Sequence, residues 1–486
     1  MSELIWLTAT EQASLIRRRE VSAVELLQAH LAQIEAVNPQ LNAIITYLPE
    51  LAIELAQAAD AKQARGEALG VLHGLPIAHK DLFETAGIRS TMGSPVFADY
   101  VPETDDLIIA RLKAAGCITL GKTNVPEFGA GSHTFNPVFG ATKNPYDLAR
   151  ACGGSSGGAA VALAAGMVPI ADGSDMGGSL RNPASFNNVV GLRPTPGRVP
   201  QYPKADAWST LSVDGPMGRT VQDVALMLRA IAGPDDRAPI SLDAPATSFA
   251  DDLRRDFQGA RIAWSRDLGC LPVEPSVIET IEAQLPVFAD IGIAVENAHP
   301  DFSDAYDIFH TLRAWGFELA FSEHFAQFGE DSFKETIRWN AAQGKQLSAA
   351  QISRAQVKRT ELFHRVREFL DVYDCLLLPT AQVPPFPIEQ EYPREINGAP
   401  MQTYIDWMMS CGFITVTGLP AISVPCGFTS DGLPVGLQMV GKPRGELALL
   451  QLAYAFQEVT RFYLRSPPHR RARRLMRSSK GVGAWN

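Results

Sequence analysis

The sequence of 486 residues has 46% hydrophobic and 20% charged residues, which is typical of a soluble globular protein of one large domain or two. Its formal net charge of −10 argues against a general nucleic-acid-binding or membrane-surface protein. The six cysteines are scattered without metal-ligand spacing, and the first residues lack a signal-peptide pattern. We therefore expect a cytoplasmic protein with reduced thiols.

The N-terminal part of the chain is rich in helix signals, with capping residues and alanine-rich runs. These signals predict a helix after Thr8, a helix from Ser22 to just before Pro39, a strand over 41–48 and a helix over 51–65. The apolar run Leu75-Pro76-Ile77-Ala78 then predicts a short strand that delivers Lys80. Burial of this strand would place the lysine in an apolar environment.

The next part alternates between helices and short apolar strands. We expect helices over 107–115, 157–165 and 221–232, and strands over 118–121 and 168–171, with a loop beginning at Lys122. Later we expect a strand over 261–264, a mostly helical stretch over 303–373, a strand over 374–379, a compact unit over 417–440 and a helix over 447–459. This alternation predicts an α/β fold, and the absence of repeats and long linkers favours a single domain.

Two glycine-serine clusters, Gly153–Gly158 and Asp175–Pro183, flank a segment of small residues. Gly153-Gly154-Ser155-Ser156-Gly157 fits the G-x-S-x-G nucleophile elbow literally, but the turn-rich residues 144–150 before it do not form the strand that this motif requires. No Gly-Lys-Ser/Thr follows for phosphate binding, and the histidines do not form a zinc motif. A metal or cofactor is therefore not expected.

The remaining chemistry uses a lysine as the base. A lysine with a pKa of about 10 is protonated at neutral pH, so it needs desolvation before it can accept a proton. Lys80, at the end of an apolar strand, suits that requirement and could activate a serine hydroxyl. Lys80 alone would more often be a structural lysine, so this hypothesis depends on the two serine clusters.

These residues resemble the signature of the amidase signature family. The matching motifs are Gly154-Ser155-Ser156-Gly157-Gly158, Asp175-x-Gly177-Gly178-Ser179-Leu180-Arg181, Gly74-Leu75-Pro76-x-x-x-Lys80-Asp81 and Gly121-Lys122-Thr123-Asn124-x-x-Glu127, with further matches after residue 190. The resemblance implies an α/β fold whose mixed, twisted central sheet is covered by helices on both faces. It also implies one domain over 1–486, with a signature core at 60–235, a variable and mostly helical pocket region at 235–400, a C-terminal part of the core at 401–460 and a basic tail at 465–486.

The same resemblance implies a Ser-Ser-Lys triad, with Ser179 as nucleophile, Ser155 as proton relay on a cis Gly154–Ser155 bond and Lys80 as base. It further implies an oxyanion hole formed by backbone N–H groups, and three residues that order the glycine loop. The oxyanion residues would be Met176, Gly177, Gly178 and Ser179, and the ordering residues Ser156, Asp175 and Arg181. The expected reaction is hydrolysis of a small-molecule amide to an acid and ammonia or an amine.

Two alternatives stay open at this point. One is the glutaminase subunit of a glutamine-dependent tRNA amidotransferase, although Gly197-Arg198-Val199-Pro200-Gln201-Tyr202-Pro203 departs from the pattern of that protein. The other is a non-catalytic scaffold, which the intact Lys80, Ser155 and Ser179 disfavour. If the aromatic residues of 303–328, with Phe128, Phe135 and Trp208, line the pocket, an apolar or aryl amide is favoured over an acidic one. The sequence does not fix an oligomeric state; a homodimer is the common outcome.

Overall fold

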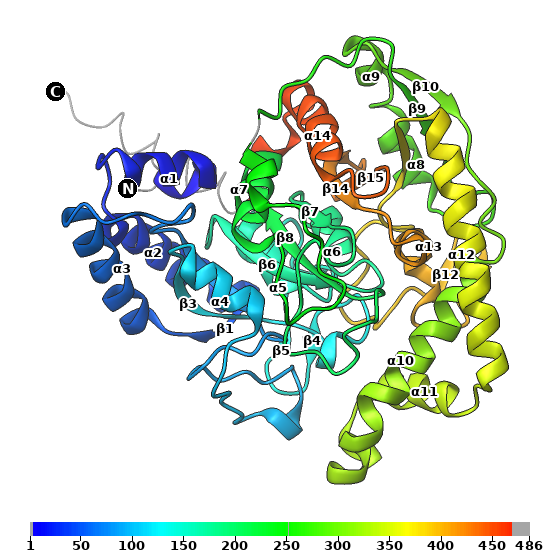
Figure 1. Cartoon of the computed structure of the whole chain (residues 1–486), viewed down its shortest axis with the longest axis horizontal. Helices are drawn as coiled ribbons and strands as arrows, with labels where there is room; N and C mark the ends of the chain where they lie inside the picture. Colours follow the sequence, from blue (N-terminus) through cyan, green and yellow to red (C-terminus); the bar gives the residue numbers. More distant parts are fainter. Residues whose placement is uncertain (1–2, 251, 469–486) are drawn as a thin grey trace.

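The computed structural model describes residues 3–250 and 252–468, so most of the predicted basic tail at 465–486 lies outside the described residues. Its centre is an eight-stranded sheet (Figure 1). The strands run in the order β10 (Ala294–Asn297), β9 (Arg261–Trp264), β11 (Cys375–Pro379), β15 (Pro434–Val440), β14 (Ala421–Phe428), β7 (Val190–Arg193), β8 (Val213–Gly218) and β6 (Ile170–Asp175). The pairs β10–β9 and β9–β11 are parallel, and the other pairs are antiparallel. The predicted mixed sheet of an α/β protein is confirmed.

Helices cover both faces of this sheet, because its strands are apolar on both sides. On β11, Leu377 packs into the core formed with α7 (Val221–Ile231), α8 (Pro275–Glu282) and α14 (Glu446–Thr460). Its neighbours Leu376 and Leu378 point to the opposite core, formed with α10 (Ala305–Phe328), α12 (Ala349–Val372) and α13 (Met409–Thr417). Each fully buried leucine of this kind contributes about 1.5–3 kcal/mol.

A second, three-stranded sheet carries the predicted lysine. Its order is β1 (Ile44–Tyr47), β3 (Ile118–Thr123), β2 (Pro76–Lys80), and β2 is parallel to β3. With the four N-terminal helices it occupies the opposite side of the molecule from α10–α12 (Figure 1). These helices are α1 (Ala9–Arg17), α2 (Ala23–Leu41), α3 (Pro49–Ala64) and α4 (Leu107–Ala114). Because β2 also packs against β6, Lys80 lies where the two sheets meet.

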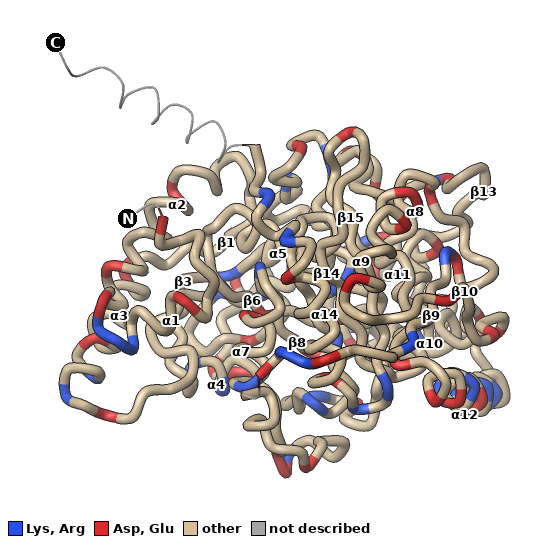
Figure 2. The backbone as a smooth tube through the Cα atoms, turned by 90° about the horizontal axis from the view of Figure 1, so that it is seen from above, with Lys and Arg blue, Asp and Glu red and all other residues tan. Residues whose placement is uncertain are grey.

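Most predicted elements agree with the structure. Thr8 and Ser22 begin α1 and α2 with capping boxes. The helices predicted at 107–115, 157–165, 221–232 and 447–459 match α4, α5 (Gly157–Ala164), α7 and α14 to within one residue at either end. The helical stretch at 303–373 consists of α10, α11 (Glu335–Lys345) and α12. Figure 2 shows acidic and basic residues interspersed along α12.

Several boundaries differ from the sequence-based prediction, and the strand expected over 41–48 is confined to β1 at Ile44–Tyr47. Helix α2 continues through Pro39 to Leu41, because Asn42 in the left-handed conformation (φ 53°) ends the helix only there. Strand β3 continues through Lys122 to Thr123 because both residues pair with β2. Strand β6 begins at Ile170 and continues to Asp175, paired with β8 throughout. Its polar half therefore belongs to the strand, whereas the sequence pattern ends the strand at Ala171.

The smaller elements complete the chain. They are α6 (Arg181–Phe186), α9 (Pro286–Asp290), and the two short hairpins β4 (Phe135–Asn136) with β5 (Gly140–Ala141) and β12 (Glu395–Ile396) with β13 (Ala399–Pro400). In residues 3–250 and 252–468, no helix is long and apolar enough to cross a membrane.

Candidate active site

Lys80 is completely buried at the C-terminal end of β2 and faces three serine hydroxyls. Its Nζ lies 2.8 Å from Oγ of Ser155, 2.8 Å from Oγ of Ser156 and 2.9 Å from Oγ of Ser174. An ammonium group can donate to all three hydroxyls. A neutral amine can donate to two of them and accept the hydroxyl proton of the third. The site therefore satisfies both protonation states of the lysine.

Asp172 on β6 fixes the backbone next to this lysine. Its Oδ1 accepts a hydrogen bond from the Lys80 backbone N–H at 2.7 Å, and its Oδ2 lies 2.5 Å from Nδ1 of His79. The other ring nitrogen of His79 lies 3.0 Å from Oγ1 of Thr119 on β3. One buried carboxylate thus holds the end of β2 against β6, and the sheets cannot slide without breaking these bonds.

Burial lowers the pKa of Lys80 to about 7, because desolvation outweighs the opposing influence of Asp214, Asp175 and Asp172. None of these three carboxylates forms an ion pair with Nζ at 4.0 Å or less among the described residues. The amine is therefore surrounded by neutral hydroxyl partners. A substantial fraction of it is unprotonated at neutral pH, as a general base requires.

The first glycine-serine cluster is held in place by hydroxyls from the preceding loop. Ser132 donates to the carbonyl of Gly154 at 2.6 Å, and Thr134 donates to the carbonyl of Gly153 at 2.8 Å. The Gly154–Ser155 bond is cis, as expected. The backbone N–H of Ser156 then donates to the carbonyl of Ser179 at 3.2 Å, which joins the first cluster to the second.

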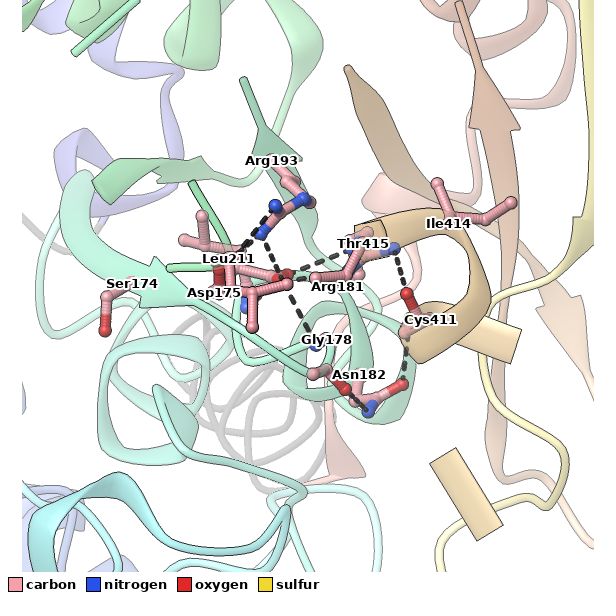
Figure 3. Close-up of polar contacts among 12 residues, drawn as sticks. Ser174, Asp175, Gly178, Arg181, Asn182, Arg193, Leu211, Cys411, Ile414 and Thr415 are labelled. Carbon is pink, nitrogen blue, oxygen red and sulfur yellow. Dashed lines mark hydrogen bonds and ion pairs between the residues drawn. The ribbon is translucent and has the colours of Figure 1, made fainter. Parts of the chain in front are cut away.

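The second cluster is organised by Asp175, the last residue of β6. The backbone N–H groups of Gly178 and Leu180 donate to its two carboxylate oxygens at 3.0 and 3.1 Å. Arg181 adds two bonds, at 3.0 and 2.8 Å, and Arg193 approaches from β7 at 3.2 Å. Figure 3 shows Asp175 between these two guanidinium groups. Burial alone would raise the pKa of Asp175, but the two cations hold it well below its usual range.

Arg181 also connects the glycine loop to the C-terminal part of the chain. Its guanidinium donates to Oε1 of Gln438 at 2.5 Å, to Oγ1 of Thr415 at 3.0 Å and to the carbonyl of Cys411 at 3.2 Å. Every one of these partners is buried. Figure 3 shows how α13 approaches the loop through Cys411 and Thr415.

Gly178 occupies a place that no other residue fits. Its φ is +106°, and an added Cβ would lie 2.6 Å from Nδ2 of Asn182 and 2.6 Å from Cβ of Cys411. Because its N–H already donates to Asp175, it can bind a further acceptor only in a three-centre bond. The N–H groups of Met176, Gly177 and Ser179 have no hydrogen-bond partner among the described residues and are available to a ligand.

A family model described as Amidase matches residues 25–450, which is most of the chain. The chain belongs to the amidase signature family. It is 36% identical to an acylamidase of Rhodococcus erythropolis, over 94% of this chain and 96% of that protein. It is 37% identical to a glutamyl-tRNA(Gln) amidotransferase subunit of Moorella thermoacetica, over 96% of this chain and 99% of that protein. The crystal structure of a bacterial aryl acylamidase of the family superposes with a TM-score of 0.87, at 30% identity, covering 94% of this chain and 98% of that one.

The structure brings together several of the site residues that the resemblance to amidase signature enzymes implied, and Ser179 joins them through its backbone carbonyl. Lys80 meets Ser155 and Ser156, and Asp175 and Arg181 order the loop that carries Ser179. Three other polar residues of this amidase signature site, Asp172, Ser174 and Arg193, received no role from the sequence. Asp172 and Ser174 are two residues apart on β6, so their side chains leave the strand on the same face. A strand predicted to continue past Ala171 would have placed Asp172 and Ser174 on one face and marked both as candidate site residues.

A cavity of about 220 Å³ with partly polar and partly apolar walls lies on the Ser174 side of the lysine. Asp106, Gln201, Lys204 and Asp214 contribute to its walls. Burial raises the pKa of Asp106 to about 7 and that of Asp214 to about 6. In the described ranges, no group of three or more His, Cys, Asp or Glu side chains is arranged to hold a metal ion.

The aromatic residues considered for the substrate pocket fall into two groups. Phe128 packs edge-on against Phe321, and its ring centroid lies 5.8 Å from that of Phe333, in a small cluster beneath α10. Trp208 is 73% exposed, so it does not belong to this cluster. Packing in this cluster does not place these side chains in a pocket, so the preference for an apolar or aryl amide stays a prediction.

Proposed function

We propose that the protein hydrolyses a carboxylic amide to an acid and ammonia or an amine, through an acyl-enzyme on Ser179. The observation that carries this proposal is the fully buried Lys80, whose Nζ lies 2.8 Å from Oγ of Ser155. A lysine with a pKa lowered to about 7 can take a proton from that hydroxyl, which an ordinary lysine cannot do at neutral pH.

Acylation begins when Ser179 Oγ attacks the amide carbonyl carbon. The Ser179 proton passes to Ser155 as the Ser155 proton passes to Nζ of Lys80, so no charge is left on either hydroxyl. The carbonyl oxygen becomes an oxyanion, which the N–H groups of Met176, Gly177 and Ser179 stabilise, with Gly178 in a shared bond. Fixed amides aimed at a developing charge are worth several kcal/mol, about 2.7–4 for one donor in a protease.

Collapse of the tetrahedral intermediate breaks the carbon–nitrogen bond. The leaving nitrogen needs a proton, which the Lys80 ammonium returns through Ser155. A water molecule then attacks the acyl carbon and gives its proton to Lys80 through Ser155. As the bond between the acyl carbon and Ser179 Oγ breaks, that proton returns through Ser155 to Ser179 Oγ and the acid is released. Lys80 is neutral again at the end of each half-reaction.

A fluorophosphonate probe tests this proposal. We expect it to phosphonylate Ser179, and mass spectrometry of the digested protein locates the adduct. The variant Ser179→Ala should take no label. Lys80→Met should label far more slowly although Ser179 is present, because the nucleophile is no longer activated. Labelling at another serine, or equal labelling of wild type and Lys80→Met, would contradict the assignment. No labelling at all would favour the non-catalytic scaffold.

A second candidate is a glutaminase subunit that passes ammonia to a partner. The likeness to an amidotransferase subunit over 96% of this chain favours it. Against it stands Gly197-Arg198-Val199-Pro200-Gln201-Tyr202-Pro203, which departs from the pattern of that protein. Under this alternative, glutamine is the preferred amide, and its hydrolysis rises when a co-purifying protein is added back. Under our first proposal, the purified chain alone turns over amides at its full rate.

A further inference from the structure

Arg313 on α10 is a buried cation with few partners. The residue is only 4% exposed. One terminal nitrogen donates to the Tyr404 hydroxyl at 2.8 Å, and the other lies 3.2 Å from Sδ of Met176. Its Nε has no hydrogen-bond partner among the described residues. A hydroxyl and a thioether are neutral, so neither balances the positive charge.

Three other buried arginines of this protein have a carboxylate partner. Arg181 and Arg193 share Asp175, and Arg198 pairs with Glu446 at 3.0 Å. In the described part of the chain, no carboxylate oxygen lies within 4.0 Å of the Arg313 guanidinium. Burying a cation without a counter-ion is strongly unfavourable, so such a group calls for an anion from elsewhere.

The charged groups near Arg313 are already engaged. Asp406 accepts hydrogen bonds from the Tyr306 hydroxyl at 2.9 Å and from the Thr403 hydroxyl at 2.7 Å. Lys334, the other cation of this region, pairs with Glu391 at 2.8 Å. Among the described residues, Arg313 thus has no counter-ion of its own.

The guanidinium lies between Met176 and Tyr404. Met176 directly precedes the Gly177–Ser179 loop. On the other side, the Tyr404 ring lies 3.7 Å from the position of a Cβ on Gly131, and the next residue, Ser132, holds the carbonyl of Gly154. Arg313 thus contacts Met176 directly, three residues before Ser179, and reaches the loop that holds the Gly154 carbonyl through Tyr404.

Aromatic rings fix the orientation of this guanidinium. The Phe317 ring centroid lies 4.2 Å from its central carbon, and the Tyr404 centroid lies 5.7 Å away. Stacking of this kind holds the planar group in one orientation while its edge nitrogens stay free to donate. A guanidinium whose orientation is fixed before binding can donate two parallel N–H bonds to the two oxygens of a carboxylate.

We propose that Arg313 binds a carboxylate of the substrate, so that the preferred substrates are amides bearing a carboxylate, such as half-amides of dicarboxylic acids. This specificity rests on the proposed amide hydrolysis and refines it. The aromatic content of 303–328 by itself disfavours an acidic substrate, but Phe321 and Phe325 pack against Phe333. Within 303–328, it is the Arg313 side chain that contacts Met176, at 3.2 Å from its Sδ.

A binding experiment tests the proposal without turnover. In the Ser179→Ala background, calorimetry measures binding of malonamate, succinamate, glutaramate and adipamate, each against the neutral amide of the same length. We expect at least one half-amide to bind about 10–100-fold more tightly than its neutral match, as a charge-assisted pair provides. Arg313→Met should abolish that preference, and Arg313→Lys should keep part of it. Arg359→Met on α12, which removes a bond to the Val416 carbonyl, is the control and should keep all of it.

Thermal stability separates a binding role from a structural one. Methionine has a similar length and no charge, so replacing an unbalanced buried cation should leave Tm unchanged or raise it. A structural arginine would lower Tm in Arg313→Met. That result, or equal binding of half-amides and neutral amides by wild type, would overturn the proposal. Fluorophosphonate labelling of Ser179 with no carboxylate preference would defeat the Arg313 assignment alone. Carboxylate binding without any labelling would defeat the hydrolase proposal alone.

Discussion

The Nζ of Lys80 lies 2.9 Å from Oγ of Ser174, a hydroxyl outside the expected triad. Two residues earlier on the same face of β6, Asp172 accepts the backbone N–H of Lys80. Strand β6 therefore holds Lys80 at two points. The Asp172 carboxylate binds its backbone N–H, and the Ser174 hydroxyl lies against its Nζ. The separate three-stranded sheet supplies the lysine, and the main sheet sets its position.

Acylation should depend on pH through the protonation state of Lys80. Only the neutral amine accepts a proton, and the pKa of Lys80 is lowered to about 7. We expect kcat/KM for an amide to rise about tenfold per pH unit below pH 7 and to level off above it. A stopped-assay series from pH 5 to pH 10, with unfolding monitored at each pH, measures this profile. A flat profile with chemistry rate-limiting would show that Lys80 is not the base.

Removing the hydroxyl of Ser174 should shift that profile. A hydroxyl stabilises the ammonium form of Lys80 more than the neutral amine, since bonds to charged groups are stronger. In Ser174→Ala the apparent pKa of kcat/KM should therefore fall, by about half to one unit. Ser212→Ala removes a hydroxyl that lines the same cavity and is not among the three that contact Nζ, so this control should keep the wild-type midpoint. A rise of the midpoint in Ser174→Ala would contradict the assigned contact.

Neutralising Asp175 should destabilise the whole protein. In Asp175→Asn the buried guanidinium groups of Arg181 and Arg193 lose their counter-ion, at a cost of about 3–5 kcal/mol at neutral pH. Urea unfolding measures the difference. Because the pKa of Asp175 is lowered in the folded protein, its contribution is complete above the unfolded value of about 4 and is lost as the pH falls below that value. The difference between the proteins should shrink there.

The control for this variant is Asp371→Asn on α12, at a solvent-exposed pair with Arg367. Its unfolding midpoint should match that of wild type. An equal loss of stability in both variants would mean that the effect has nothing to do with burial of the Asp175 cluster.

A methyl group at Gly178 should disrupt the loop that carries Ser179. It would lie 2.6 Å from side-chain atoms of Asn182 and Cys411, at a φ of +106°. We expect Gly178→Ala to lose at least about a hundredfold in kcat/KM, the scale of losing one oxyanion donor. Gly316→Ala in α10, where an added Cβ meets nothing within 4 Å, should keep full activity and raise Tm slightly. Full activity of Gly178→Ala would mean that the loop tolerates displacement.

The sequence predicted the apolar and capped elements well, because their signals are local. Ser22 with its capping box and the amphipathic α7 needed no tertiary information. The resemblance that the motifs carry implied that Lys80, Ser155 and Asp175 share one site. The roles of Lys80 and Ser179 came from the resemblance, and the structure supplies the contacts around them.

Other features depended on contacts that no local pattern reveals. The polar half of β6 looks like a loop, yet pairing with β8 keeps Asp172 and Ser174 in a strand. The assignment of β2 to a second sheet follows from its pairing with β3, far along the chain. The unbalanced charge of Arg313 becomes visible only when its surroundings are known. An arginine on an amphipathic helix is ordinarily a surface residue.

The bonds from Arg181 to Gln438 and Thr415 join residues separated by 257 and 234 positions in the chain. During synthesis from the N-terminus, Lys80 and both serine clusters are made long before these partners exist. A nascent chain that ends before α13 leaves the Arg181 guanidinium without them. The loop that carries Ser179 therefore reaches its final structure only after strand β15 has emerged from the ribosome. A premature stop between α6 and α13 yields a chain that has Lys80, Ser155 and Ser179 but lacks these partners of Arg181.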